Sequence, residues 1–179
     1  MQNKDSKNTK KIIIIGLDNS GKTSIVMCLK GVKNLSSFSS VTPTRNFEIS
    51  KFRTLGSTFS IWDFGGQERF REEYLTNFYD HLQGARKLIF VLDVQDRGRY
   101  HVALEYLAEI IKLLRKFKID LDFSLFLHKY DPDIDFIKKD INEEIIQFLV
   151  NEIEKLIPND LPYRIFKTSI YTVFQKSAL

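Results

Sequence analysis

Residues 16–23 read Gly16-Leu17-Asp18-Asn19-Ser20-Gly21-Lys22-Thr23 and fit the pattern G-x-x-x-x-G-K-[ST] of a phosphate-binding loop. Four isoleucines precede the loop at residues 12–15, as in a strand buried on both faces, and residues 24–30 read as a helix. In this order of strand, glycine-rich turn and helix, backbone N–H groups and the positive end of the helix face a bound anion. A chance glycine turn before a helix is the alternative interpretation.

The residue types of the loop suit the phosphate chain of a nucleotide. Gly16 and Gly21 let the backbone curl so that successive N–H groups point inward. Lys22 provides a mobile cation for the β- and γ-phosphates, and the hydroxyl of Thr23 is a ligand suited to Mg²⁺. The residues predicted to bind the phosphates are Gly16, Asp18, Asn19, Ser20, Gly21, Lys22, Thr23 and Ser24.

The composition is that of one globular domain, with 179 residues of which 43% are hydrophobic and 28% charged. We expect the polar residues 1–10 to be disordered and residues 11–179 to form the domain. Cys28 is the one cysteine, which excludes an internal disulfide, and we expect it to be buried on the first helix. The net charge of +4 is mild, and we interpret the lysine clusters as solvated surface rather than as a site for nucleic acid or an acidic lipid surface.

Strands and helices alternate along the rest of the chain. Residues 47–62 alternate apolar and polar side chains on both sides of a turn, which predicts an antiparallel hairpin. Apolar runs predict strands at 88–93, 123–127 and 163–167, and helical spacing predicts helices at 69–83, 100–117 and 141–157. A short helix at 171–179 would close the chain, and its length suggests truncation. The pattern predicts an α/β fold with a doubly wound, mostly parallel six-stranded sheet and one antiparallel edge strand.

Four polar motifs each follow a predicted strand, at residues 16–23, 63–67, 128–131 and 168–170. Ligands of doubly wound folds bind at the carboxyl ends of the strands, so these motifs are predicted to meet at one edge of the sheet. The carboxylate of Asp131 can accept both the ring N1–H and the exocyclic amine of guanine, which adenine lacks. The Lys129 stem can lie along the base, and the N–H of Ile170 can meet the guanine carbonyl. A solvated charged loop and an adenine-nucleotide site are the alternatives.

Taken together, the motifs resemble those of the Ras-superfamily small GTPases, a branch of the P-loop NTPases. The resemblance lies in Gly16–Thr23, Pro43-Thr44, Trp62-Asp63-Phe64-Gly65-Gly66-Gln67, Lys129 with Asp131, and Thr168-Ser169-Ile170. Gly-Leu-Asp in the loop and Pro-Thr before a phenylalanine-bearing strand resemble the Arf branch. The guanine motif that begins with His128 and the closing Thr-Ser-Ile resemble the Rag branch. The chain is therefore similar to a G domain that lies between Arf and Rag.

The resemblance implies a role for each matching residue. Thr23 and Thr44 would coordinate Mg²⁺, Asp63 would hold a metal-bound water, Gly66 would sense the γ-phosphate, and Gln67 would orient the attacking water. The implied catalytic residues are Gln67, Lys22 and Thr44. The implied guanine-binding residues are His128, Lys129, Asp131, Ser169 and Ile170. Two switch segments, from the serine-rich loop through residue 44 and from 64 to about 79, would be ordered by GTP and released by hydrolysis to GDP.

Departures from the family pattern affect the expected partners. His128 stands where most relatives have an asparagine that ties the guanine loop to the phosphate loop, and we expect binding to survive this change. Gln2 and a polar start give no myristoylation site, and the chain ends without a prenylation cysteine, so no intrinsic lipid anchor is expected. The resemblance implies a cytoplasmic protein that a partner recruits to membranes. Implied partners are an activating protein, an exchange factor, effectors and, through a C-terminal domain, a dimer partner.

Two functions follow from these residues. In the first, the chain is a switch enzyme that hydrolyses GTP slowly, because no arginine is clearly placed to stabilise the transition state. Arg45 follows Thr44 but is expected to point away as a strand residue. In the second, the chain is a nucleotide-stabilised scaffold that binds a partner and rarely hydrolyses. Gln67 and Thr44 favour the enzyme, since a scaffold needs neither. Phe47 and Trp62 are expected either to face a partner or to pack in the core.

Overall fold

The computed structural model describes residues 9–32, 37–38, 40–54, 57–132, 134–138 and 140–170. Within them one six-stranded sheet runs in the order β2-β3-β1-β4-β5-β6. Only the β2–β3 pairing of this sheet is antiparallel, so the predicted mostly parallel sheet with one reversed edge strand is confirmed. The strands are β1 (Thr9–Gly16), β2 (Phe47–Thr54), β3 (Ser57–Phe64), β4 (Ala85–Asp93), β5 (Asp122–His128) and β6 (Tyr163–Thr168).

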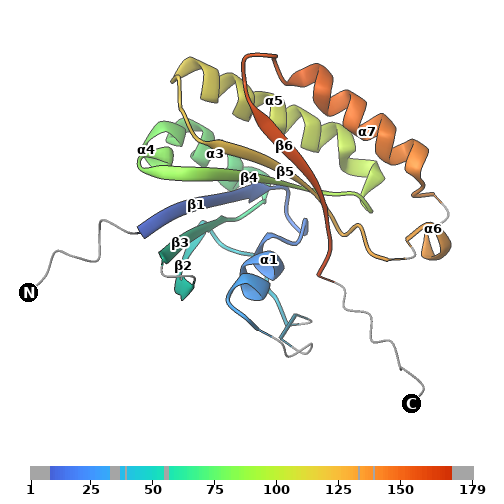
Figure 1. Cartoon of the computed structure of the whole chain (residues 1–179), viewed down its shortest axis with the longest axis horizontal. Coiled ribbons are helices and arrows are strands. Elements are labelled where there is room, and N and C mark those ends of the chain that lie inside the picture. The colour runs from blue at the N-terminus through green and yellow to red at the C-terminus, as the bar shows by residue number, and fades with distance from the viewer. Residues whose placement is uncertain are drawn as a thin grey trace, which may run out of the picture.

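Helices cover both faces of the sheet (Figure 1). One face carries the long helices and the smaller α3 and α4, while α1 packs on the other face. The helices are α1 (Lys22–Leu29), α3 (Glu68–Thr76), α4 (Phe78–Leu82), α5 (Tyr100–Lys116), α6 (Ile134–Ile137) and α7 (Glu143–Leu156), and η2 (Arg97–Arg99) is a 3₁₀ turn. The middle strands bury isoleucine, leucine and valine on both sides, as the continuous apolar runs require.

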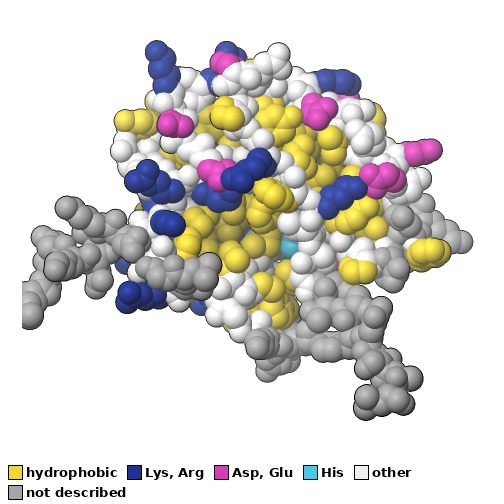
Figure 2. All heavy atoms as spheres, in the orientation of Figure 1, with side chains coloured by type: hydrophobic (Ala, Val, Ile, Leu, Met, Phe, Trp, Pro, Cys, Tyr) yellow, Lys and Arg dark blue, Asp and Glu magenta, His cyan; other side chains and the backbone are white. Residues whose placement is uncertain are grey.

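The two faces of the sheet have unequal cores. A large cluster around Leu107, Phe90 and Leu125 joins α5 and α7 to the sheet, whereas a small one around Ile25 and Val26 joins α1 to it. Figure 2 shows hydrophobic side chains gathered across the middle of the α1 side, with lysine and arginine side chains among and around them. The parallel strands between these layers end at one edge, and the predicted motifs follow them there.

Several sequence-based boundaries differ from the structure. β1 begins at Thr9, so residues 9 and 10, which the polar composition predicted to be disordered, belong to the strand, and residues 1–8 lie outside the described residues. Cys28 is exposed rather than buried, because Ile25 and Val26 are the α1 side chains that reach the sheet. The predicted final helix at 171–179 and most of the serine-rich loop also lie outside the described residues.

The helix predicted at residues 69–83 is two helices, α3 and α4, that meet at Asn77. Asn77 has φ −104° and ψ 20°, and its side-chain amide donates to the carbonyl of Glu73 at 3.3 Å. The hydroxyl of Thr76 likewise donates to the carbonyl of Glu72 at 3.0 Å. Side chains that bond to helix carbonyls in this way compete with the backbone and favour a break. Among the described residues no helix is long and apolar enough to span a bilayer.

Candidate functional site

The phosphate-binding loop is closely packed on both sides, against the backbone of β4 at Gly16 and against the His128 side chain at Gly21. Gly16 has φ +149°, and a Cβ there would overlap the carbonyl oxygen of Val91 on β4. Gly21 has φ +90°, and a Cβ there would lie 2.5 Å from His128 Cδ2 and 2.8 Å from His128 Nε2. Residues with a side chain fit neither position without displacing a neighbour. The close contacts at positions 16 and 21 therefore explain why the motif requires glycine there.

Lys22 is buried, at 5% exposure, at the beginning of α1. Its ammonium donates to the carbonyl of Leu17 at 2.6 Å, so the lysine closes the loop on itself. Burial lowers the pKa of Lys22 to about 8, while the carboxylates of Asp63 and Asp18 act in the opposite direction. A buried cation whose hydrogen bond among the described residues is to a neutral carbonyl is suited to a multiply charged anion, which would replace that carbonyl as its partner.

The three residues predicted to serve a magnesium ion converge next to this lysine. The hydroxyl of Thr23 donates to Asp63 Oδ2 at 2.5 Å, and the hydroxyls of Thr23 and Thr44 lie 3.1 Å apart. The other carboxylate oxygen, Asp63 Oδ1, is buried and has no hydrogen-bond partner among the described residues. Burial raises the pKa of Asp63, while the hydrogen bond from Thr23 and the charge of Lys22 act in the opposite direction. Hydroxyl and carboxylate oxygens are the ligands that Mg²⁺ prefers, so this group of atoms fits the ion.

The segment after β3 packs directly against the phosphate-binding loop. A Cβ on Gly66 would overlap the backbone of Leu17 and Asp18, and a Cβ on Gly65 would overlap the carbonyl oxygen of Thr44. The N–H of Gly65 donates to the carbonyl of Asn46 at 2.7 Å. The backbone around Thr44 and the Gly65–Gly66 pair thus touch each other and the loop at the end of the site where Thr23 lies.

A cavity of about 360 Å³ opens between these segments. Gln67, the N-cap of α3, lines it together with Lys22 and Thr44, so the structure brings the three implied catalytic residues to one space. Its described lining is Asp18, Asn19, Gly21, Lys22, Thr23, Ser24, Phe38, Val41, Thr42, Pro43, Thr44, Gly65, Gly66, Gln67 and Lys129. Ser20 is outside the described lining of the cavity and is buried within the loop, with its hydroxyl unpaired among the described residues.

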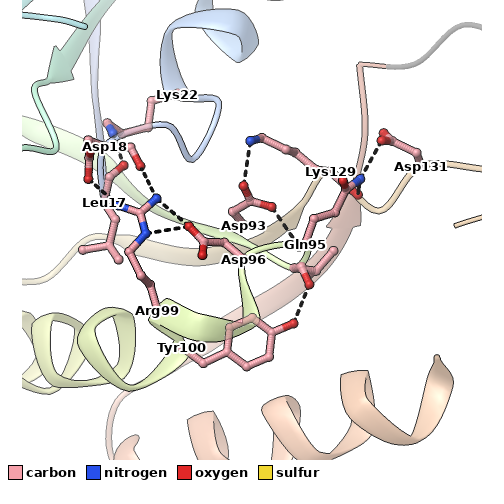
Figure 3. A network of polar contacts seen from close by, with 11 residues as sticks. Leu17, Asp18, Lys22, Asp93, Gln95, Asp96, Arg99, Tyr100, Lys129 and Asp131 are labelled. Carbon is pink, nitrogen blue, oxygen red and sulfur yellow. Dashed lines mark hydrogen bonds and ion pairs between the residues drawn. The ribbon is translucent and has the colours of Figure 1, made fainter. Parts of the chain in front are cut away.

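The base end of the site is built from side chains that support one another (Figure 3). The Gln95 amide donates to Asp131 Oδ2 and to the carbonyl of Lys129, both at 2.8 Å. The hydroxyl of Ser169 donates to the other oxygen of Asp131. The ammonium of Lys129 pairs with Asp93 at 2.6 Å. The structure therefore groups Lys129, Asp131 and Ser169 as predicted. Of the predicted guanine-binding residues only Lys129 is in the described lining of the cavity, while Asp131, Ser169 and the exposed Ile170 lie outside it.

His128 connects the two ends of the site. It is buried at the end of β5, its Nδ1 lies 2.9 Å from the Thr168 hydroxyl on β6, and its other ring edge faces Gly21. Burial lowers the pKa of His128 to about 4, and the neighbouring charge of Lys129 acts in the same direction. The imidazole is therefore neutral at physiological pH. It occupies the space between the guanine motif and the phosphate-binding loop, the place where the family pattern has an asparagine.

Three residues that the sequence interpretation did not include complete this network. Asp93 pairs with Lys129, Gln95 orients Asp131, and Arg99 pairs with Asp18 at 2.7 Å (Figure 3). All three lie on or just after β4, which ends at the same edge of the sheet as the other motif-bearing strands. The sequence feature that indicates these residues is the polar run after the apolar strand at 88–93, which resembles the polar runs that follow the other strands.

Phe47 and Trp62 pack against each other on the hairpin beside the site. Their rings stack at 5.1 Å, and the ammonium of Lys11 lies 3.7 Å from the centre of the Trp62 ring. Both aromatic residues are half-buried and contact the larger core cluster. Core packing therefore accounts for part of each surface, and the remainder is open to solvent.

Comparison with known proteins agrees with this geometry. The family model described as the Gtr1/RagA G protein conserved region matches residues 11–175. The chain belongs to the Gtr1/RagA family of G proteins. This family implies, in general, binding of GTP and GDP with Mg²⁺, hydrolysis of GTP, and regulators and effectors that recognise the nucleotide state. The chain's place between Arf-like and Rag proteins, predicted from its motifs, is confirmed by the relatives described next.

GTP-binding protein GTR1 of Saccharomyces cerevisiae is 31% identical over 182 residues, which cover 96% of this chain and 56% of that protein. ADP-ribosylation factor-like protein 3 of Caenorhabditis elegans is 34% identical over 126 residues, which cover 68% of this chain and 61% of that protein. The chain thus spans a little over half the length of these relatives. The Arl6 BBS3 small GTPase of Trypanosoma brucei, solved with GppNp, shares the fold with a TM-score of 0.65 at 24% identity, covering 90% of this chain and 87% of that one.

Proposed function

We propose that this G domain is a molecular switch that binds GTP with Mg²⁺, hydrolyses it slowly and changes its partner surface when the γ-phosphate leaves. The observation that supports this most is the contact between Thr44, Gly65–Gly66 and the phosphate-binding loop. Two chain segments meet at the end of the site where a γ-phosphate would lie. Loss of that phosphate would remove their shared ligand, which is how order–disorder switches of this kind work.

Each residue at this end has a task that its position supports. The ammonium of Lys22 pairs with the β- and γ-phosphate oxygens, and the N–H of Gly66 donates to the γ-phosphate. The hydroxyls of Thr23 and Thr44 and, through water, the carboxylate of Asp63 would hold Mg²⁺. When bound, the ion neutralises charge that develops on the phosphate oxygens. Gln67 orients the attacking water and keeps it in line with the bond that breaks.

Slow hydrolysis is proposed because the described lining of the cavity contains no arginine. Arg45 and Arg69 instead line a wider hollow of about 870 Å³ outside Thr44, together with Gln67. G domains without an arginine in the site turn over at roughly 10⁻⁴ per second, and an arginine supplied by a partner raises the rate by about 10³- to 10⁵-fold. The outer hollow is the face through which an activating protein would reach Gln67.

The first test is the nucleotide that the purified protein carries. Denaturation followed by ion-pair chromatography should release GDP or GTP at close to one molecule per chain, because a cavity of this kind holds its nucleotide tightly. Release of an adenine nucleotide would contradict the guanine assignment at Asp131. A chain that carries no nucleotide and takes up neither GTP nor GDP with Mg²⁺ would contradict the proposed function as a whole.

The second test separates a switch enzyme from a nucleotide-stabilised scaffold. In single-turnover hydrolysis of bound GTP, Gln67→Leu should be at least about tenfold slower than the parent, since it removes the residue that orients the water. Gln83→Leu, a change of an exposed glutamine after α4, is the matched control and should leave the rate unchanged. Equal rates for Gln67→Leu and the parent would remove Gln67 from the mechanism. No hydrolysis by the parent would favour the scaffold.

We further propose that the protein acts in trafficking or signalling from the cytoplasm and reaches membranes through a partner. The activating protein, the exchange factor and the effectors would bind around Thr44 and Gln67, where the two switch segments meet. A second copy or a related chain would bind through a C-terminal domain. Fractionation of cells that express the tagged protein, with the nucleotide state set by Gln67→Leu, tests whether recruitment to membranes follows GTP.

A further inference from the structure

Asp18 is an acidic residue in a loop that is built to bind an anion. Asp18 lines the 360 Å³ cavity, and its side chain is 47% exposed. An unpaired carboxylate beside a triphosphate would repel it, and the loop would lose affinity for the ligand that its N–H groups attract. The presence of Asp18 therefore requires a compensating charge.

Arg99 supplies this charge from the other side of the loop (Figure 3). Its Nη1 donates to Asp18 Oδ1 at 2.7 Å, and its Nη2 donates to the Asp18 carbonyl at 3.2 Å. The guanidinium thus donates hydrogen bonds to both the side chain and the backbone of the same loop residue. A fork of this kind fixes direction as well as distance, so the carboxylate is held toward the beginning of α5.

Arg99 is itself held in place by a rigid part of the molecule. Its Nε donates to Asp96 at 2.6 Å, and it lies in the 3₁₀ turn that leads into α5. The helix continues into the core through Ala103 and Leu107, both of which are buried. The position of Arg99 is therefore fixed independently of the loop, and the pair with Asp18 transfers that rigidity to the loop.

The pair lies at the γ-phosphate end of the site rather than at the base end. The Asp18 N–H lies where a side chain on Gly66 would have to be, and Gly66 is the residue implied in sensing the γ-phosphate. Asp18 and Arg99 also both act on the buried ammonium of Lys22, the first favouring its charged form and the second opposing it. A change in either charge should therefore alter the affinity for a triphosphate more than the affinity for a diphosphate.

We propose that Arg99 is a positioning residue that neutralises Asp18, turns its carboxylate away from the phosphates and thereby sets the preference of the site for GTP over GDP. The inference rests on the proposed function, since it concerns the same nucleotide site. The proposed function concerns whether GTP and GDP bind, whereas this inference concerns the ratio of the affinities for GTP and GDP. The parent protein tests the proposed function, and the variants test the inference.

The experiment uses the full chain, stripped of nucleotide with EDTA and titrated with fluorescent N-methylanthraniloyl GDP and with the same label on GppNp, both with Mg²⁺. Arg99→Gln should weaken the GppNp label about tenfold more than the GDP label, the size expected for one partly screened charge. Adding Asp18→Asn to Arg99→Gln should restore the ratio of the parent, because the charge to be neutralised is gone. Arg97→Gln, a change of the neighbouring arginine that donates to the Asp140 carbonyl instead, is the matched control and should leave the ratio unchanged.

Rescue by Asp18→Asn distinguishes charge compensation from bracing. If Arg99 only braced the loop, removing its acceptor as well would not help, and the double variant would bind as poorly as Arg99→Gln. That result, or an unchanged ratio in Arg99→Gln, would overturn the inference while the proposed function stands. A parent that binds neither label would instead overturn the proposed function.

The single change Asp18→Asn tests the inference if Arg99→Gln does not fold. This change of a half-exposed side chain leaves the guanidinium without one of its two carboxylates, so its positive charge acts on the γ-phosphate. The preference for labelled GppNp over labelled GDP should then rise above that of the parent. An unchanged or lower preference would overturn the inference.

Discussion

The two ends of the nucleotide site are built in different ways. At the phosphate end, backbone packs on backbone: Gly16 lies against β4, and Gly66 lies against Asp18. At the base end, side chains from three separate segments hold one another, with Gln95 and Ser169 both bonded to Asp131. Lys22, Asp63 and Gly66 at the phosphate end are buried, while Asp131 is half-exposed and Ser169 exposed. The first end should therefore decide whether any nucleotide binds, and the second should decide which one.

The largest expected effect is at the phosphate end, with Lys22→Ala. Loss of the buried ammonium leaves the β- and γ-phosphates without their cation, and truncation of one partner of a buried charged pair costs about 2–5 kcal/mol. Affinity for GTP, GDP and ATP should all fall by about 300-fold in calorimetric titration, which is near the middle of that range. If GTP weakened and ATP did not, the division between the two ends would be wrong.

The next effect is at the base end, with Asp131→Asn. The new amide presents donors toward a guanine edge that itself donates, so affinity for GTP should fall by about 100-fold. Affinity for ATP should change by less than about threefold, because adenine does not offer that pair of donors. Competition of each nucleotide against labelled GDP measures both values. Equal losses for GTP and ATP would show that Asp131 acts on the phosphates or on the fold.

Above pH 8, nucleotide affinity is expected to fall by about tenfold per pH unit because of Lys22. Burial lowers its pKa to about 8 in the free protein, and bound phosphates would raise it again. Above pH 8 the free lysine loses its proton, binding must recover it, and affinity falls as the pH rises. Titration in buffers of different ionisation enthalpy should show uptake of close to one proton at pH 9 and of almost none at pH 7. The same uptake at both values would contradict this account.

The last and smallest expected effect is on stability rather than on nucleotide affinity, and it concerns His128, where the two ends meet. Its pKa is lowered to about 4 from an ordinary 6.5, so the unfolded chain takes up the proton first as the pH falls. The free energy of unfolding should therefore decrease by about 1.4 kcal/mol per pH unit as the pH falls from 6.5 to 4. The stabilising contribution of the neutral His128 should be complete above pH 6.5. His128→Asn should remove this contribution from urea unfolding curves measured across that range. The same pH dependence for the variant and the parent would show that folding does not lower the pKa of His128.

The contrast between the two ends also explains what the sequence could predict. The strand, loop and helix around Gly16–Thr23 depend on local residue types, so the pattern of the chain predicted them correctly. The alternation of strands and helices predicted the sheet and its reversed edge strand for the same reason. Thr23, Thr44 and Asp63 were expected to meet through the resemblance to a family, and the structure brings their oxygens together.

What the sequence did not predict depends on contacts between distant segments. Gln95 and Arg99 act through side chains that reach Asp131 and Asp18, 36 and 81 residues away, and no local pattern encodes such distances. The break at Asn77 arises because its side chain competes for a helix carbonyl, which apolar spacing does not report. Cys28 is exposed because α1 turns Ile25 and Val26 to the sheet, and composition alone favoured its burial.

One measurement tests the central claim, that one nucleotide site binds phosphates at Lys22 and guanine at Asp131. The nucleotide-stripped protein is titrated calorimetrically with GTP and with ATP, each with Mg²⁺ and with EDTA. We expect one GTP per chain, binding at least about 100-fold tighter than ATP and markedly tighter with Mg²⁺ than without it. Equal affinities for GTP and ATP, or no binding of either, would contradict the account.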